Sequence, residues 1–109
     1  MSRKALGEFE ILVLLALLRL GDGTYGVPVI REIERRTGRE VAPAAVYVAL
    51  QRLEKKGLIT TWLSDPVAER RGKPRRHLRL KPQAMELLKE SHRTLTRMWS
   101  GLEPLLEER

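Results

Sequence analysis

Glycine residues interrupt the first half of this sequence at intervals that limit the chain to short helices. Three segments have the apolar spacing of a helix, and a glycine that favours a helix end follows each of them. The segments are residues 6–20, 27–37 and 43–56, and the glycines are Gly21, Gly38 and Gly57. A chain of 109 residues has room for one modest core. We therefore expect three short helices to share that core.

The third segment, residues 43–56, has two different faces when it is drawn as a helix. Its apolar stripe predicts the side that faces the core and consists of Val46, Ala49, Leu50 and Leu53. The opposite stripe consists of Ala44, Tyr47, Val48, Gln51, Arg52 and Lys55. The amide of Gln51 can pair with adenine, and the guanidinium of Arg52 can pair with guanine. Tyr47 and Lys55 suit phosphate oxygens, so this stripe is either a nucleic-acid contact or an ordinary solvated helix face.

A predicted hairpin with a cationic loop follows the third segment. Residues 58–63 are rich in β-branched and aromatic side chains, and residues 76–80 alternate in character, which predicts two antiparallel strands. Five cations crowd the loop and its exit: Arg70, Arg71, Lys73, Arg75 and Arg76. Like charges this dense repel one another, and a phosphate backbone would neutralise them with release of counterions. Together with a net charge of +7 and an isoelectric point near 10.4, the loop favours nucleic-acid contact over a passive solvated loop.

The last predicted helix begins near Pro82 and has little of its own domain to lie against. Leucines recur along it every seven residues, and a methionine lies between two of them, which is the spacing of a helical seam. The residues of this seam are Leu88, Leu95, Met98 and Leu102. The helix at residues 6–20 is apolar on all sides, so it also requires a further partner, and both features predict a homodimer. Pro104 does not fit a helix interior, so we expect the last helix to kink or end near Gly101.

The order of these elements predicts a fold class. Three helices, a small β-hairpin and a further helix indicate a mainly α-helical protein of the winged helix-turn-helix type. In that fold the third helix enters the major groove of DNA, and the hairpin, or wing, reaches the neighbouring groove or the backbone. We expect residues 1–80 to form the DNA-binding domain, with the helix at 6–20 shared with the dimer interface, and residues 81–109 to form a C-terminal dimerisation helix.

The sequence lacks the usual features of enzymes, metal sites and membrane proteins. It contains no cysteine, and its two histidines, His77 and His92, fall on different predicted elements. The apolar run at residues 11–18 is too short to span a bilayer, and no signal-peptide cleavage site follows it. We therefore predict a cytoplasmic, nucleoid-associated protein that is not an enzyme, is not bound to a membrane and uses no metal or cofactor.

Several segments resemble the PadR family of bacterial transcriptional regulators, in its short form with a single C-terminal helix. The resemblance spans residues 7–102 and rests on Thr24-Tyr25-Gly26, on VAPAAVYVALQRLEKKGLI at residues 41–59, and on GKPRR at 72–76 with the following LRL. It implies a homodimer joined through the first and last helices, a pseudo-palindromic operator, Tyr47 against the DNA backbone and a wing that contacts DNA. Some members of the family resemble sensors of drug or phenolic effectors. Trp99 therefore either packs in the dimer seam or contacts a small aromatic effector.

The sequence departs from that family at the start of the third helix. Ala42 stands where the family usually has serine, and Ala44 and Ala45 stand where it has glycine and threonine. Lys81 and Ala84 replace a threonine and a glycine after the hairpin. An alanine cap costs about 1 kcal/mol against serine, and alanines can add only contacts with thymine methyl groups. We expect the fold to be kept, while the strength and sequence preference of DNA binding differ.

The leading hypothesis is a sequence-specific DNA-binding transcriptional regulator, a repressor that acts as a homodimer on a pseudo-palindromic operator in double-stranded DNA. The first alternative is a winged-helix module that binds a protein partner and carries its charge only incidentally. Such a module would elute from heparin at low salt and would give no duplex-specific shift. The second alternative is a DNA-associated accessory factor of a phage or plasmid, which genomic neighbourhood would distinguish.

Overall fold

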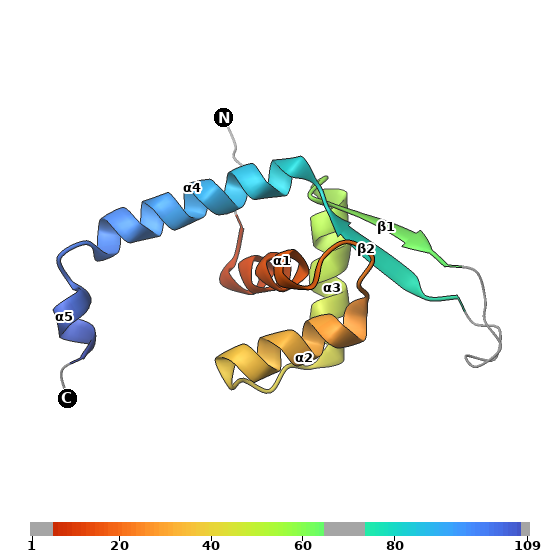
Figure 1. Ribbon diagram of the computed structural model, residues 1–109, viewed down its shortest axis with the longest axis horizontal. Coiled ribbons are helices and arrows are strands. Elements are labelled where there is room, and N and C mark those ends of the chain that lie inside the picture. The colour runs from red at the N-terminus through yellow and green to blue at the C-terminus, as the bar shows by residue number, and fades with distance from the viewer. Residues whose placement is uncertain (1–5, 65–73, 108–109) are drawn as a thin grey trace.

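The computed structural model describes residues 6–64 and 74–107, and these ranges are mainly helical (Figure 1). In chain order the elements are α1 (Glu8–Leu20), α2 (Gly26–Thr37), α3 (Pro43–Lys55), β1 (Ile59–Leu63), β2 (Arg76–Leu80), α4 (Pro82–Trp99) and α5 (Glu103–Leu106). The two strands form an antiparallel hairpin. The predicted fold class is confirmed, and the ends of the first three helices agree with the prediction to within two residues.

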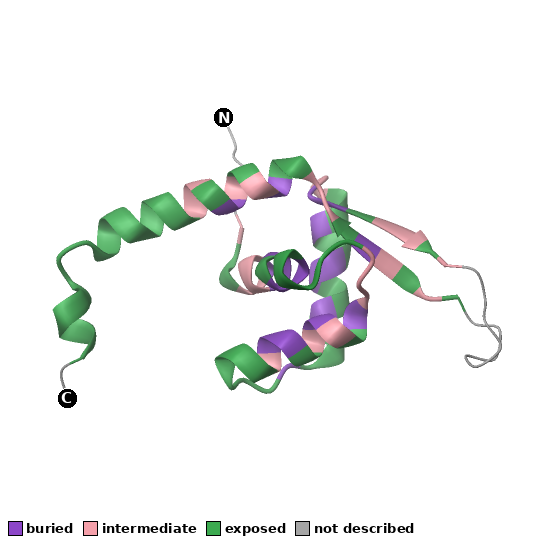
Figure 2. Cartoon of the chain, viewed as in Figure 1, coloured by how far each residue is buried: buried purple, intermediate pink, exposed green. Residues whose placement is uncertain are grey.

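α1, α2 and α3 share one apolar core, and the hairpin closes it (Figure 2). All four residues of the predicted inward stripe of α3 are buried, and two of them, Val46 and Leu53, have no exposed surface. Val13 and Leu14 of α1 are buried to the same extent and belong to the same core. The spacing of apolar residues in α3 therefore predicted its orientation correctly.

The hairpin is attached to the loop that joins α1 and α2. On one edge of β2, Leu78 pairs with Thr61 of β1. On the other edge the Leu78 amide donates to the Thr24 carbonyl at 2.8 Å, and the Gly23 amide donates to the Leu78 carbonyl at 2.9 Å. The Nδ1 atom of His77 lies 2.6 Å from the Gly23 carbonyl oxygen. The hairpin is thus held to the loop between α1 and α2 by backbone and side-chain hydrogen bonds along one edge of β2.

α4 leaves the three-helix core soon after it begins, and most of its length is exposed (Figures 1 and 2). Ala84 and Leu88 are buried in the core, whereas Leu95 is 52% exposed and Met98 is 71% exposed. This corrects the expectation that Leu88 belongs to an uncovered seam, because Leu88 packs within its own domain. The surface left for a partner begins further along the helix.

α4 ends at Trp99, close to the place where the sequence predicts a kink or an end. Gly101 has a φ of 87°, a left-handed conformation that suits glycine, and Pro104 lies in the first turn of α5, where a proline is tolerated. Leu102 therefore lies between two helices, and the seven-residue repeat does not continue along a single one. Among the described residues, no helix has both the length and the apolar character needed to cross a membrane.

A buried carboxylate joins the start of α1 to the end of α3. Glu10 is 9% exposed, and Lys56 Nζ donates to both of its oxygens at 2.9 and 3.1 Å. The Gly7 amide donates to the same carboxylate at 3.1 Å. Burial acts to raise the pKa of Glu10, but the hydrogen bonds from Lys56 and Gly7 and the nearby charges of Lys56 and Arg52 outweigh it, so the pKa lies below its usual value.

Replacing Glu10 with glutamine should lower the free energy of unfolding at pH 7 by about 1.5–3 kcal/mol, the usual contribution of hydrogen bonds to a charged partner. The pKa of Glu10 in the folded chain lies below the ordinary value of 4.5, so its contribution is complete above that pH and is lost as the pH falls through the folded value. Urea titrations of the wild type and of Glu10→Gln at neutral and acid pH measure this, and the difference between them should shrink in acid. Glu8→Gln, at an exposed ion pair, is the control and should change stability by less than about 1 kcal/mol. A Glu10→Gln difference that stays constant with pH would contradict the assignment.

Candidate nucleic-acid interface

The side of α3 that faces away from the core is exposed along the whole helix. A row of four residues runs along the middle of this side: Ala44, Val48, Gln51 and Lys55. Their spacing of four, three and four residues places them on one face, and at 3.6 residues per turn that face lies opposite the buried stripe. We call this row the outward row of α3. It is free of core contacts and includes four of the six α3 residues that the sequence predicts to contact DNA.

Tyr47 lies on the flank of α3 that faces the hairpin, and its ring packs on Gly26 at the start of α2. A Cβ atom at position 26 would lie 2.7 Å from Tyr47 Oη and Cε1, which is closer than side chains approach one another. A side chain at position 26 would therefore displace the Tyr47 ring from this place. The Tyr47 side chain is still 47% exposed. The Thr24-Tyr25-Gly26 motif thus has a physical role that the sequence alone did not predict, because its glycine leaves room for the tyrosine ring.

A short chain of hydrogen bonds connects this flank of α3 to the wing. The Thr61 hydroxyl donates to Glu54 Oε2 at 3.0 Å, and Arg76 Nη1 donates to the Thr61 oxygen at 2.9 Å. Together with Tyr47 and Gln51, these three residues line a hollow between α3 and the hairpin. Arg76 was predicted as a DNA contact, and the structure also gives it a partner within the chain. The sequence provides no signal for this link, because its members come from three different elements.

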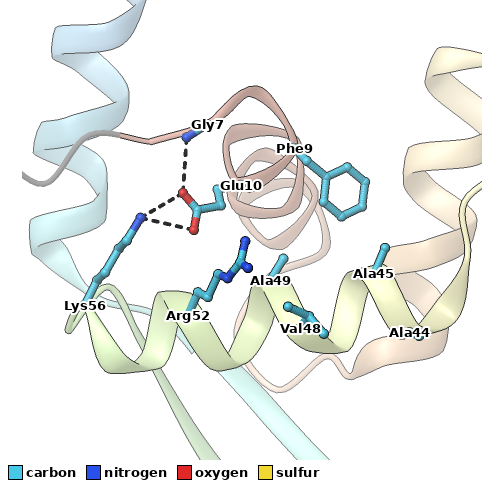
Figure 3. Close-up of a pocket in the computed structure, with 9 residues that line it drawn as sticks. All are labelled: Gly7, Phe9, Glu10, Ala44, Ala45, Val48, Ala49, Arg52 and Lys56. Atoms are coloured by element: carbon cyan, nitrogen blue, oxygen red, sulfur yellow. Dashed lines mark hydrogen bonds and ion pairs between the residues drawn. The ribbon is translucent and has the colours of Figure 1, made fainter.

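Arg52 lies on the opposite flank of α3, beside the N-terminal turn of α1. Figure 3 shows its side chain reaching toward Glu10, and its positive charge contributes to the lowered pKa of that carboxyl. Phe9, Val48 and Arg52 are among the residues that line a shallow hollow between α1 and α3. Arg52 itself remains exposed. Gln51 and Arg52, which are neighbours in the sequence, therefore have different surroundings: Gln51, in the outward row, borders the hairpin, and Arg52 borders α1.

The wing is only partly described. Arg70, Arg71 and Lys73 lie outside the described residues. Arg75 lies with its guanidinium carbon 3.8 Å from the centre of the Tyr25 ring, a cation–π contact with the residue that precedes α2.

Aromatic stacking joins the two strands near the loop end of the hairpin. The Trp62 ring stacks on His77 at 5.6 Å with an interplanar angle of 25°, and the Arg79 guanidinium lies 5.0 Å from the centre of the Trp62 ring. Trp62 and His77 thus have packing roles in the strands, and Arg79 also pairs with Asp22 at 3.4 Å. Within residues 6–64 and 74–107, histidines and carboxylates form no group of three that could hold a metal ion.

Solved structures with the same arrangement are transcriptional regulators. A PadR family regulator from Clostridium difficile is similar over 92% of this chain and 99% of its own, with a TM-score of 0.74 and 22% identity. A transcriptional regulator from Clostridium thermocellum is similar over 90% of this chain and 92% of its own, with a TM-score of 0.70 and 21% identity. A PadR family regulator from Eggerthella lenta is similar over 94% of this chain and 88% of its own, with a TM-score of 0.69 and 24% identity. These similarities establish the winged-helix fold.

The family assignment comes from the sequence. No curated protein matches the chain. The profile of the transcriptional regulator PadR-like family matches residues 14–90, which extend from the middle of α1 to the middle of α4 and include all of α3 and both strands of the hairpin. This chain therefore belongs to the PadR-like family of transcriptional regulators.

Proposed function

We propose that this protein is a homodimeric repressor that recognises a pseudo-palindromic operator in double-stranded DNA. Membership of the PadR-like family supports the general class, a DNA-binding transcriptional regulator. The observation that carries the proposal is the exposed outward row of α3 beside the hairpin, because a helix that reads DNA must keep one face free of core contacts. A dimer bound to an operator that overlaps a promoter would exclude RNA polymerase, which is why repression is the proposed effect.

The residues of α3 have different roles in the proposed complex. Gln51 reads adenine from the side of the hairpin, and Arg52 reads guanine from the side of α1, so the two contact different base pairs. Tyr47 and Lys55 bind phosphate oxygens and set the position of the helix in the major groove. The cations of the wing bind the sugar–phosphate backbone next to the groove and supply affinity that does not depend on sequence.

A second copy of the chain would cover apolar residues that one copy leaves exposed. These are Leu15 and Leu18 on α1, and Leu95, Met98 and Trp99 on α4. In the proposed dimer the two α3 helices enter successive major grooves roughly 34–36 Å apart. Trp99 is 45% exposed and, in this proposal, packs in the seam next to Met98. The alternative role of Trp99 is contact with a small aromatic effector held between the two copies.

Selection of bound fragments from random duplex DNA tests the proposal as a whole. The expected result is a consensus with two-fold symmetry, because a symmetric dimer binds two equivalent half-sites. Transcription in vitro from a promoter that overlaps the selected site should fall when the protein is added. A protein that retains no duplex, or only sites without symmetry, would contradict the assignment.

Replacing Gln51 with alanine should relax the preference at one base pair in each half-site, by about 1–3 kcal/mol of discrimination. Lys55→Ala is the matched comparison on the same row, and it should weaken binding to all duplexes about equally because a phosphate contact carries no sequence information. Competition gel shifts with operators altered one base pair at a time measure both effects. If Gln51→Ala weakened binding to the original operator and to every altered operator by the same factor, Gln51 would not read a base.

Replacing Arg70, Arg71 and Lys73 together with alanine should weaken binding to every duplex and flatten its salt dependence. Each lost phosphate contact lowers the slope of log affinity against log salt by about 0.9. The control replaces Lys89, Arg93 and Arg97, three exposed residues of α4, which removes the same total charge from a helix that leads away from the strands of the hairpin (Figure 1). Titrations at several salt concentrations distinguish the two. An unchanged slope in the wing variant would remove these cations from the interface.

Replacing Leu95 with glutamate should convert the dimer to a monomer and abolish tight operator binding, because it places a charge in the proposed apolar seam. Sedimentation equilibrium reports the mass directly. Leu63→Glu, a change of the same kind at an exposed leucine of β1, should leave the mass of the dimer unchanged. A wild-type protein that sediments as a monomer at micromolar concentration would disprove the proposed dimer.

A further inference from the structure

The first two turns of α3 present apolar side chains on its outward row. Ala44 and Val48 precede Gln51 and Lys55 in that row, and Val48 is 44% exposed. Val48 is not needed for the core, which is filled by the opposite stripe of α3. It also continues directly into the residues proposed to contact DNA. An exposed β-branched residue at this position is therefore part of the same surface.

No polar side chain of α3 lies beside Ala44 and Val48 in the outward row. Tyr47, the one polar residue between Ala44 and Gln51, is directed to the hairpin flank by its packing on Gly26. Hydrogen-bonding side chains in the outward row therefore begin only at Gln51. In a helix-turn-helix protein the N-terminal part of the recognition helix contacts the base edges. The part of α3 that goes deepest into the groove thus offers methyl groups in place of hydrogen-bond donors and acceptors.

An apolar side chain discriminates between bases in one way only. Against guanine, cytosine or adenine it would remove water from donors and acceptors that it cannot satisfy, which is unfavourable. Against thymine it meets the C5 methyl group, the one apolar feature of the major-groove edge. Resting on the proposed function, we infer that Val48, with Ala44 beside it, selects pyrimidines that carry a 5-methyl group, so each half-site contains thymine at the pair that faces Val48.

Deoxyuridine substitution tests this inference with the full-length protein and its selected operator. Replacing one thymine at a time by deoxyuridine removes only the methyl group and keeps the hydrogen-bonding edge. At the position facing Val48 the Kd should rise about threefold to fourfold per half-site, the effect of burying one methyl-sized group. At the same position, 5-methylcytosine should bind more tightly than cytosine by a similar factor, because it restores the methyl group alone.

Two variants separate contact with Val48 from an effect of deoxyuridine on DNA shape. In Val48→Ala the deoxyuridine penalty at that position should fall to less than about 1.5-fold, because the partner of the methyl group is gone. Val27→Ala removes the same atoms from another exposed valine, on α2, and should leave the penalty unchanged even if it alters overall affinity. Both valines are exposed, so neither change should unfold the protein.

The outcomes of this experiment distinguish the inference from the proposed function. Symmetric operator binding without any deoxyuridine penalty, or with a penalty equal in the wild type and Val48→Ala, would overturn methyl recognition and leave the regulator assignment intact. Duplex binding without any sequence preference, or no duplex binding, would overturn both. A penalty that is present in the wild type and in Val27→Ala but lost in Val48→Ala supports both.

Discussion

The burial of one apolar stripe on α3 determines which of its residues can meet a partner. Val46 and Leu53 have no exposed surface, and full burial of such a side chain contributes about 1.5–3 kcal/mol. A rotation of α3 by one residue would expose this stripe and bring the amide of Gln51 and the carboxylate of Glu54 into the core, where neither would find enough partners. The outward row is therefore a consequence of core packing. Its chemistry can change from one protein to another without a large loss of stability.

Polar contacts on both flanks of α3 then hold the neighbouring elements in place. On one side Glu54, Thr61 and Arg76 link the helix to the hairpin, and on the other Glu10 and Lys56 link it to α1. Each of these hydrogen bonds includes a charged group and contributes at most about 1.5–3 kcal/mol, but its direction is specific. A helix and a wing that already have a fixed relative orientation lose less conformational freedom on binding, which favours affinity. The contacts that orient the interface therefore matter more for binding than their share of the total stability suggests.

Features that depend on local sequence could be predicted, and those that depend on the packing of distant elements could not. Glycine stops and apolar spacing were sufficient for the three core helices and the inward stripe of α3, and β-branched content with alternation was sufficient for the hairpin. The burial of Leu88 was not predicted, because a seven-residue repeat does not show where α4 leaves the core. The divergence of Gln51 and Arg52 was not predicted either, since it depends on where α1 and the hairpin lie beside α3. The same is true of the link through Thr61, whose partners are distant in sequence.

In the proposed interface the cations of the wing act over a longer distance than the side chains of α3. This difference determines which of them can distinguish one DNA sequence from another. Counterion release at the wing acts on any duplex and weakens steeply with salt. Contacts of Val48 and Gln51 with base edges act only at short range and involve no net charge, so salt affects them little. The alanines at the start of α3 remove hydroxyl groups that could have bound phosphates there, which leaves more of the affinity to the cations elsewhere. In this proposal, discrimination between operators then depends on three exposed residues of α3, Val48, Gln51 and Arg52, whose orientation the core determines.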